Sequence, residues 1–468
     1  MRNRVVQLKP KAVPFDVAIA AYRSARYDDC LAALDAHTGT QARTLAVRAL
    51  SRLGRADAAL ALCSTEPGLP ISERAELSIL KTIALIRLGR TDEAEAEILQ
   101  ARVFAYSSCS AAIEADYERV EAHLRFYRHD LAGASAAVDR ALAVGPAPQA
   151  WQNHDREYFL SLRLVRASVY DLRGQLARAK EGLRAQLHWA QLALAELDAD
   201  PHEDEWLRAT LLSNFAVLAS DAGDPSLREE LRQRASTIEW SNDAKLQHFF
   251  VMRALGWLSA LNGDHLGAFR DFRASAELAP SRAWKMHAVL DRSLLARELK
   301  QDVFAEDELN HALELAGELD LAAPTRDPFP SFSALLKLAE LAAERDPAEG
   351  RAILNRYRAA RSKCPSALFD GGDRRWQASE LMSEGIVARA EGRTQLATDL
   401  LINAFDAFDK LGSRWRAALA ALELAAMTGQ PFFYGYAARE AGGRPQSWMA
   451  RRLAQLEAEQ RPLEAPFK

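Results

Sequence analysis

The feature that most constrains the fold of this chain is a short break that recurs between helical segments. In each copy a glycine ends one segment, four residues follow, and an alanine lies early in the next segment. The paired residues are Gly54/Ala59, Gly89/Ala94, Gly174/Ala179, Gly263/Ala268 and Gly392/Ala397. Glycine suits a helix C-terminus because it adopts positive φ angles without strain. Alanine is small enough for two helices to cross closely, so the pattern predicts repeated helix–turn–helix units.

The segments between the breaks have the apolar period of α-helices, and strand signals are nearly absent. The chain has 468 residues, with 60 Lys and Arg against 64 Asp and Glu, and its hydrophobic fraction is 49%. This composition excludes collagen, low-complexity disorder and a strongly basic nucleic-acid packaging protein. We therefore expect an all-α chain, long enough to form an extended repeat array.

The repeated unit resembles the tetratricopeptide repeat (TPR), a helix–turn–helix unit of about 34 residues. In the best copy, Gly256 matches the small residue of the first helix, Ala268 the close-packing alanine, and Phe272 the large residue of the second helix. Gly263 matches the turn, and Pro280 the terminal proline. A second copy consists of Gly385, Gly392, Ala397 and Leu401.

About eleven candidate turns follow from this alignment. They lie near Arg26, Gly54, Gly89, His129, Gly174, Gly223, Gly263, Gln301, Arg345, Gly392 and Gly429. The resemblance therefore implies a right-handed superhelical solenoid of about eleven TPR-like units. The segment from Gly392 to Gly429 is also similar to the helical sensor solenoids of large bacterial ATP-dependent transcription regulators. The phosphate-binding loop GxxxxGK(S/T) of their ATPase part does not occur in this sequence.

Proline and glycine positions suggest how the chain is divided. Three prolines lie between Pro324 and Pro330, which marks the strongest candidate boundary in the array. We expect a flexible N-terminal segment (1–14), an N-terminal TPR-like array (15–322), a C-terminal TPR-like array (323–445), and a capping helix with a tail (446–468).

No catalytic motif was found, and the four cysteines are far apart and lack zinc-site spacing. The densest cluster of acids and imidazole, His202 to Glu205, is interpreted as a solvated helix start, with a divalent-cation site or a docking patch as alternatives. No segment has the pattern of a signal peptide or a membrane span. We expect a cytoplasmic protein that is not an enzyme, has no cofactor or metal, and does not bind membranes.

The resemblance implies a groove lined by the first helix of each unit, in which a protein or peptide partner binds. Exposed polar positions on those helices are the candidate contacts: Asn214, Arg253, Arg292 and Arg389. A basic run supplies a second candidate surface, in which Arg351, Arg358 and Arg361 share one helix face. That run is interpreted as a solvated face, with an acidic partner or nucleic acid as alternatives.

An aromatic cluster near the end of the array gives a candidate self-association site. Phe432, Phe433 and Tyr436 follow Pro431, where an array has fewer neighbouring helices. Aromatic residues at this helical spacing are interpreted as core residues, with an exposed contact and a possible homodimer through the C-terminal units as the alternative. The sequence as a whole predicts a non-enzymatic protein- or peptide-binding scaffold or adaptor in bacterial-type cytoplasmic regulation. The alternative is a ligand- or peptide-responsive sensor that controls a transcription factor or a DNA target.

Overall fold

The computed structural model is helical throughout the part of the chain that it describes. The described residues are 14–64, 67–145, 161–199, 204–319, 321, 329–364, 374–442 and 446–460. They form 23 α-helices and one short 3₁₀-helix, and they contain no strand. The predicted all-α class is therefore confirmed.

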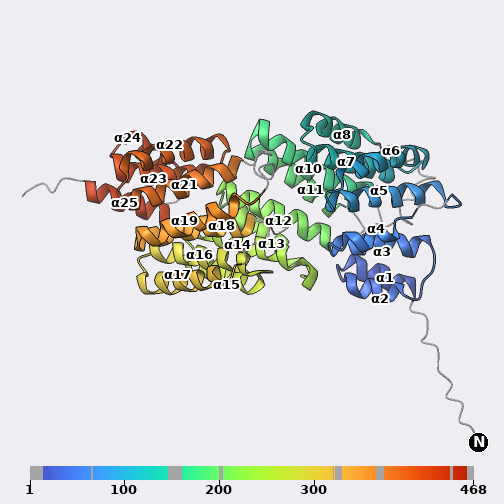
Figure 1. The fold of residues 1–468 in the computed structure, drawn as a ribbon, viewed down its shortest axis with the longest axis horizontal. Helices are drawn as coiled ribbons and strands as arrows, with labels where there is room; N and C mark the ends of the chain where they lie inside the picture. Colours follow the sequence, from blue (N-terminus) through green and yellow to red (C-terminus); the bar gives the residue numbers. More distant parts are fainter. Residues whose placement is uncertain are drawn as a thin grey trace, which may run out of the picture. The chain divides into compact units, whose positions relative to one another are not determined.

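The described helices form eleven pairs in chain order, after which one further described helix remains (Figure 1). The first six pairs are α1 (Phe15–Arg23) with α2 (Tyr27–Leu34), α3 (Thr40–Arg52) with α4 (Ala56–Leu62), α5 (Ile71–Arg87) with α6 (Thr91–Ser107), α7 (Ala111–Tyr127) with α8 (Leu131–Ala143), α10 (Leu162–Glu181) with α11 (Leu183–Asp198), and α12 (Glu205–Ala222) with α13 (Leu227–Ser236).

The 3₁₀-helix η1 (Asn242–Ala244) precedes the seventh pair. The remaining pairs are α14 (Lys245–Leu261) with α15 (His265–Leu278), α16 (Arg282–Glu298) with α17 (Asp302–Gly317), α18 (Phe329–Arg345) with α19 (Pro347–Arg361), α21 (Arg374–Ala390) with α22 (Thr394–Lys410), and α23 (Arg414–Thr428) with α24 (Pro431–Gly442). The last helix is α25 (Trp448–Gln460). We call the first member of each pair a first helix and the other a second helix.

Ten of the predicted turns separate the two helices of a pair, but the turn predicted at Gly174 is wrong. Helix α10 continues through Gly174, which is buried, and the break with positive φ falls at Gly182 (φ 82°). The small residue at Gly174 therefore lies on a packed face of the helix. A helix can retain an interior glycine at a cost of about 1 kcal/mol relative to alanine.

Three turns that lack glycine use other residues in the left-handed region. Ala25, His129 and Lys300 have φ angles of 52°, 60° and 59°. A side chain makes this conformation costly, so it persists only where the surrounding helices fix it. The degenerate copies of the repeat thus keep the backbone path of the turn without its usual residue.

Close packing within a pair follows the TPR pattern at Gly256 on α14. A Cβ atom at this position would lie 2.5 Å from the ring of Phe272 on α15, which is fully buried, as is Ala268. Gly385 on α21 is similar, because a Cβ there would lie 2.7 Å from Leu401 on α22. The small and large residues of the motif therefore set the distance between the paired helices.

Contacts divide the chain into two compact units. Unit 1 comprises residues 1–176, 189–211 and 239–244, and unit 2 comprises residues 177–188, 212–238 and 245–468. The boundary predicted between residues 322 and 323 lies outside the described residues, as do residues 1–13 and 461–468 of the predicted terminal segments. The four predicted segments therefore stay a prediction.

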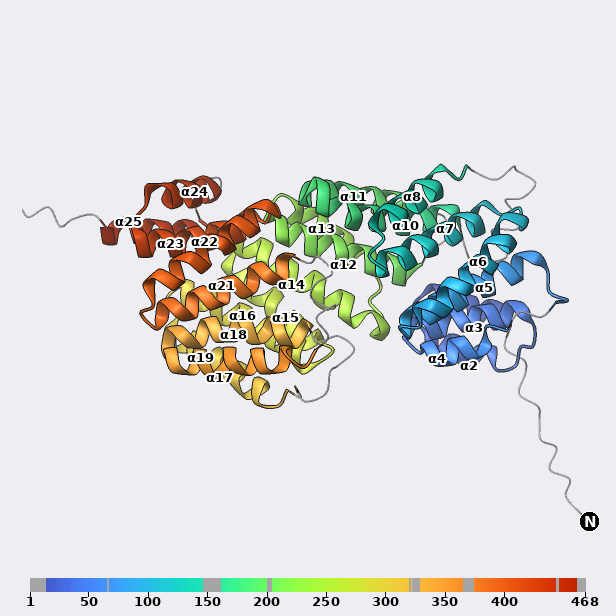
Figure 2. The ribbon, with the colours of Figure 1, turned by 45° about the horizontal axis from the view of Figure 1, so that its top comes forward.

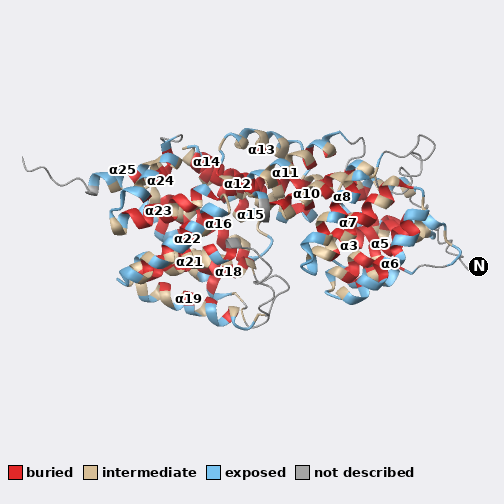
Figure 3. Cartoon of the chain, turned by 90° about the horizontal axis from the view of Figure 1, so that it is seen from above, coloured by how far each residue is buried: buried red, intermediate tan, exposed pale blue. Residues whose placement is uncertain are grey.

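First helices of neighbouring pairs contact one another in both units. In unit 1, α3 contacts both α1 and α5, and α5 contacts α7; in unit 2, α18 contacts both α16 and α21 (Figure 2). Buried residues gather on the faces where such helices meet (Figure 3). Helix α25 contacts two first helices in the middle of unit 2, α14 and α16, in addition to α23 and α24. None of the described helices is both long and apolar enough to cross a membrane.

Candidate functional site

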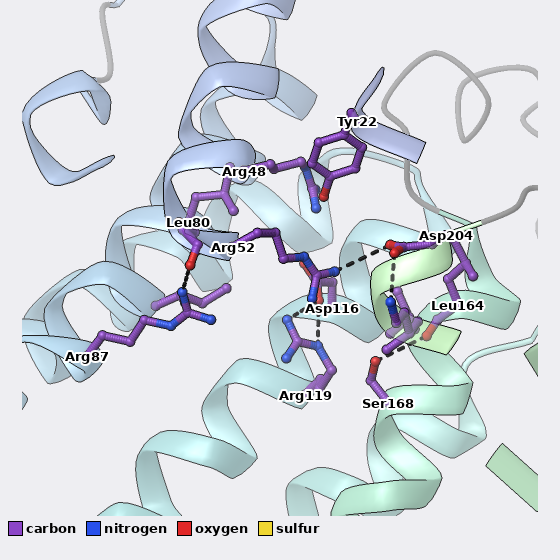
Figure 4. A pocket seen from close by; sticks show the side chains of 14 residues that line it. Tyr22, Arg48, Arg52, Leu80, Arg87, Asp116, Arg119, Leu164, Ser168 and Asp204 are labelled. Atoms are coloured by element: carbon purple, nitrogen blue, oxygen red, sulfur yellow. Dashed lines mark hydrogen bonds and ion pairs between the residues drawn. The ribbon is translucent and has the colours of Figure 1, made fainter. Parts of the chain in front are cut away.

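Unit 1 contains a hollow of about 130 Å³ whose walls come from first helices (Figure 4). Helices α1, α3, α5, α7, α10 and α12 all contribute to it. The lining residues are Tyr22, Arg48, Ser51, Arg52, Leu80, Ile83, Arg87, Asp116, Arg119, Leu164, Val165, Ser168, Asp204 and Leu207. Four arginines among apolar and hydroxyl-bearing side chains make this hollow the strongest candidate for ligand binding in the described structure.

Three of the four arginines pair with carboxylates of the chain itself. The pairs, with their nitrogen–oxygen distances, are Arg48 with Glu76 (2.7 Å), Arg52 with Asp204 (3.4 Å), and Arg119 with Asp116 (2.7 Å). Helix position explains two of these pairs. Asp204 precedes α12 and accepts a hydrogen bond from the Leu207 amide at 2.9 Å, so the carboxylate also caps that helix. Asp116 lies one turn before Arg119 on α7.

Arg87 differs from the other three arginines. Its Nη1 donates a hydrogen bond to the backbone carbonyl oxygen of Ser51, at the end of α3, and no carboxylate among the described residues lies within ion-pair distance. Arg87 as a residue is exposed to water, although neighbouring atoms reduce the hydration of its guanidinium. Burial lowers the pKa of Arg87, and the neighbouring charges of Arg52 and Arg119 lower it further. The local electrostatic potential is therefore positive.

His123 on α7 adds no charge to this region. Burial is the main reason that its pKa falls to about 3, and the positive charges of Arg119 and Arg87 contribute to the same direction. The imidazole is therefore neutral near pH 7. Arg52 and Arg119 pair with the lining carboxylates of Asp204 and Asp116, and Arg48 pairs with Glu76, which lies outside the lining. This balance leaves one positive charge without a counter-ion.

Unit 2 carries charged side chains on its first helices, but these side chains are paired. Arg253 on α14 donates to the fully buried Asp291 on α16 at 2.6 Å, and Lys337 on α18 pairs with the same carboxylate. The two cations hold the pKa of Asp291 at about 2, against the effect of burial. These two ion pairs connect the first helices α14, α16 and α18. They also neutralise the Asp291 carboxylate, because a buried charge is stable only when it is paired.

The predicted contact residues of unit 2 belong to such pairs. Arg389 on α21 lies 3.2 Å from both Glu344 and Glu423, and Arg292 lies 2.8 Å from Glu308 on its own partner helix. The exposure that we expected for Arg253, Arg292 and Arg389 is therefore wrong: each is half-buried and paired, because the polar face of a first helix packs against its neighbours. Asn214 is half-buried on α12. Whether these four residues bind a partner stays a prediction.

The arginines of the basic run on α19 pair with glutamates on and just after α21. Arg351 pairs with Glu391 at 2.6 Å and Arg361 with Glu380 at 3.1 Å. Arg358, between them on the helix, pairs with Glu384. The three arginines do share one face, as expected, and that face is directed at the acids of α21 and its C-terminal end. The run is therefore less positive in the fold than it is in the sequence, and its proposed partners stay a prediction.

The three aromatic residues of the candidate self-association site differ in exposure. Phe432 is 63% exposed, whereas Phe433 and Tyr436 are 6% and 7% exposed. Phe433 and Tyr436 lie in the core, where both pack against Phe405 of α22 and the Tyr436 hydroxyl donates to Asp409. Of the three, only Phe432 is accessible to a second copy of the chain, and the homodimer stays a prediction.

Sequence reasoning missed the hollow in unit 1, although the sequence contains a signal for it. Arg52 and Arg87 each open the same quartet, Arg-Leu-Gly-Arg, at the end of successive first helices. Their equivalent positions place both side chains on the same face of the repeat. The other lining arginines, Arg48 and Arg119, have no such common motif. The described residues contain no group of three or more His, Cys, Asp or Glu side chains arranged to hold a metal ion.

Comparison with known proteins gives a likeness of structure. No protein-family model matches the chain. No curated protein matches it either. A crystal structure of a Rap protein complexed with Competence and Sporulation Factor superimposes with a TM-score of 0.52 at 15% identity, covering 83% of this chain and 100% of that one.

Two further structures are similar at lower scores. The apo form of RapI has a TM-score of 0.48 at 14% identity, over 82% of this chain and 98% of that chain. The apo form of the quorum sensor NprR from B. thuringiensis has a TM-score of 0.42 at 12% identity, over 87% and 98%. With the helix pairs described above, the Rap likeness shows that this chain has the fold of a TPR-like helical solenoid.

Proposed function

We propose that this chain is a non-enzymatic, peptide-binding adaptor that holds a segment of a partner protein at the hollow of unit 1. The proposal depends on which helices supply the lining residues of the hollow. All six contributing helices are first helices, the surface that the TPR resemblance assigns to partner binding. The hollow thus lies where consecutive repeats offer side chains to the same ligand.

The lining suits recognition of a peptide. Leu80, Ile83 and Leu164 offer apolar contact, while Ser51 and Ser168 bring hydroxyl groups among the arginines. Recognition of a short segment needs this combination, because apolar area supplies affinity and a few polar groups fix orientation. The lining includes no histidine or cysteine that could activate a nucleophile, which favours binding over catalysis.

The structural comparison supports the same class of function. The Rap structure with which this chain shares its fold is a complex with Competence and Sporulation Factor. A solenoid of this type therefore accommodates a partner molecule, and a comparable role for this chain requires no change of architecture.

The proposal is tested by peptide selection with a matched pair of variants. A displayed library of random nonapeptides is selected against the intact chain. Binding of the selected peptides is then compared in Ser168→Trp, which fills the hollow, and Leu99→Trp, which adds the same ring to a position on α6 that is 62% exposed. Circular dichroism and thermal unfolding confirm that both variants are folded.

We expect Ser168→Trp to weaken binding by about tenfold or more, and Leu99→Trp to leave it unchanged, because only the former removes space from the site. The proposal is refuted if no peptide is selected by the intact chain. It is also refuted if the selected peptides bind Ser168→Trp as well as they bind the unaltered chain.

A further inference from the structure

The charge balance of the hollow defines the chemistry of its ligand. Three of the four guanidinium groups have a carboxylate partner within 3.4 Å, and Arg87 has none among the described residues. Arg87 is exposed, so a ligand can reach its guanidinium, and neighbouring atoms reduce the hydration of that group without an ion pair in return. An anion bound beside Arg87 would restore that balance.

The geometry of Arg87 leaves it free to bind such an anion. Within the described structure its Nη1 donates to the Ser51 carbonyl oxygen, which orients the side chain across from α5 to the end of α3. The guanidinium is a planar fork with further N–H donors, which matches the two oxygens of a carboxylate. Figure 4 shows Arg87 reaching in from one helix while Arg52 and Arg119 come from two others.

The size of the charge excess distinguishes a carboxylate from a phosphate. The neutral His123 adds no positive charge, so Arg87, the one lining arginine without a described carboxylate partner, supplies a single unpaired positive charge. One carboxylate neutralises it, whereas a phosphate dianion would bring a second negative charge close to Asp116 and Asp204.

The remaining walls specify what should be attached to the carboxylate. Ile83 and Leu80 lie on α5 with Arg87, and Leu164 and Val165 face them from α10. These side chains can pack against the methylene groups of an acidic side chain, while its carboxylate reaches the guanidinium. A volume of about 130 Å³ has room for such a side chain.

We propose that the hollow of unit 1 is a recognition site for a single acidic side chain of the partner peptide, with Arg87 as the residue that pairs with it. This inference rests on the proposed function and adds the class of ligand to it. Arg52 and Arg119 are already paired with Asp204 and Asp116, which leaves Arg87 to pair with the ligand.

Two synthetic nonapeptide pools test this inference. Both have blocked ends and randomised uncharged residues, and they differ only at the central position, which is Glu in one pool and Gln in the other. Each pool is passed over the immobilised intact chain, over Arg87→Gln, and over Arg90→Gln, and mass spectrometry measures the retained fraction. Arg90 is a matched control because it is exposed, pairs with Glu93 and lies three residues from Arg87.

We expect the intact chain and Arg90→Gln to retain the Glu pool about tenfold more strongly than the Gln pool, as a charge-assisted hydrogen bond requires. Arg87→Gln should lose this preference while it still retains both pools weakly. Adding about 10 mM inorganic phosphate, with the ionic strength held constant, should leave the preference for the Glu pool intact.

The inference is overturned if the intact chain retains both pools equally, or if Arg90→Gln loses the preference as fully as Arg87→Gln. It is also overturned if phosphate abolishes the preference, since the site would then select phosphate. Retention of both pools without preference leaves the proposed function standing, whereas retention of neither pool refutes the proposed function together with the inference.

Discussion

Replacing Asp291 by asparagine should destabilise the central first helices of unit 2. The Asp291 side chain is fully buried and neutralises two cations, Arg253 at 2.6 Å and Lys337. The substitution keeps the shape of the side chain but leaves both cations buried without a counter-ion. Breaking a buried pair in this way costs about 3–5 kcal/mol.

The lowered pKa of Asp291 points in the same direction. In the folded chain it is about 2, below its ordinary value of 3.8. By linkage, that difference corresponds to about 2 kcal/mol of stability that is present above pH 4 and lost as the pH falls from 4 to 2. We therefore expect a loss of about 3 kcal/mol near pH 7.

Native-state hydrogen exchange is the appropriate assay, because a long repeat array does not unfold in a single two-state step. A loss of about 3 kcal/mol should speed the slowest amide exchange in α14, α16 and α18 by about a hundredfold. Glu277→Gln serves as the control. It removes the partner of Arg273 on α15, in a pair whose side chains are 68% and 74% exposed, and should change exchange by less than about twofold.

Two results would contradict this reasoning. If Asp291→Asn sped exchange in the three helices by less than about fivefold at pH 7, the buried pairs would contribute little to stability. The second result concerns pH. The difference in stability between the unaltered chain and the variant, measured by hydrogen exchange, should narrow as the pH falls from 4 to 2. A difference that stays constant over that range would mean that Asp291 is not ionised in the folded chain.

Two further predictions concern unit 2. Burial raises the pKa of Glu340 to about 7, so folding favours the protonated carboxyl, and the stability of the fold falls as the pH rises from 4.5 through 7. Glu340→Gln should therefore stabilise α18 by about 2–3 kcal/mol at pH 8 and by much less at pH 5, as measured by hydrogen exchange. Arg452 on α25 pairs with Glu298 and Glu423, so Arg452→Glu should detach α25 from the fold. Limited proteolysis should then cleave this variant within 446–460 at protease concentrations that leave the control variant Arg451→Glu intact. Equal cleavage of both variants would contradict the second prediction.

The repeat architecture could be predicted from the sequence because its determinants are local. A glycine at the end of a first helix and an alanine five residues later mark the turn and the close crossing, and Gly256, Ala268 and Phe272 occupy the expected positions in the structure. The failure at Gly174 has a physical reason. A buried glycine that permits close packing has the same sequence signature as one that ends a helix.

The pairing of charges could not be predicted, because it depends on contacts distant in the sequence. Arg253 and Asp291 are 38 residues apart, and Arg351 and Glu391 are 40 apart. Arg87 illustrates the converse case. In the sequence it differs little from Arg52, and only the fold shows that Asp204 neutralises Arg52 while no described carboxylate neutralises Arg87.

The central claim, that the first helices of unit 1 bind a peptide, is tested most directly by hydrogen exchange with a bound peptide. A peptide selected against the intact chain is added at saturating concentration, and protection is compared among the helices of unit 1. The account predicts protection of α3, α5 and α7, with α2, α4, α6 and α8 unchanged. Protection confined to those second helices, or protection elsewhere with none in α3, α5 and α7, would contradict it.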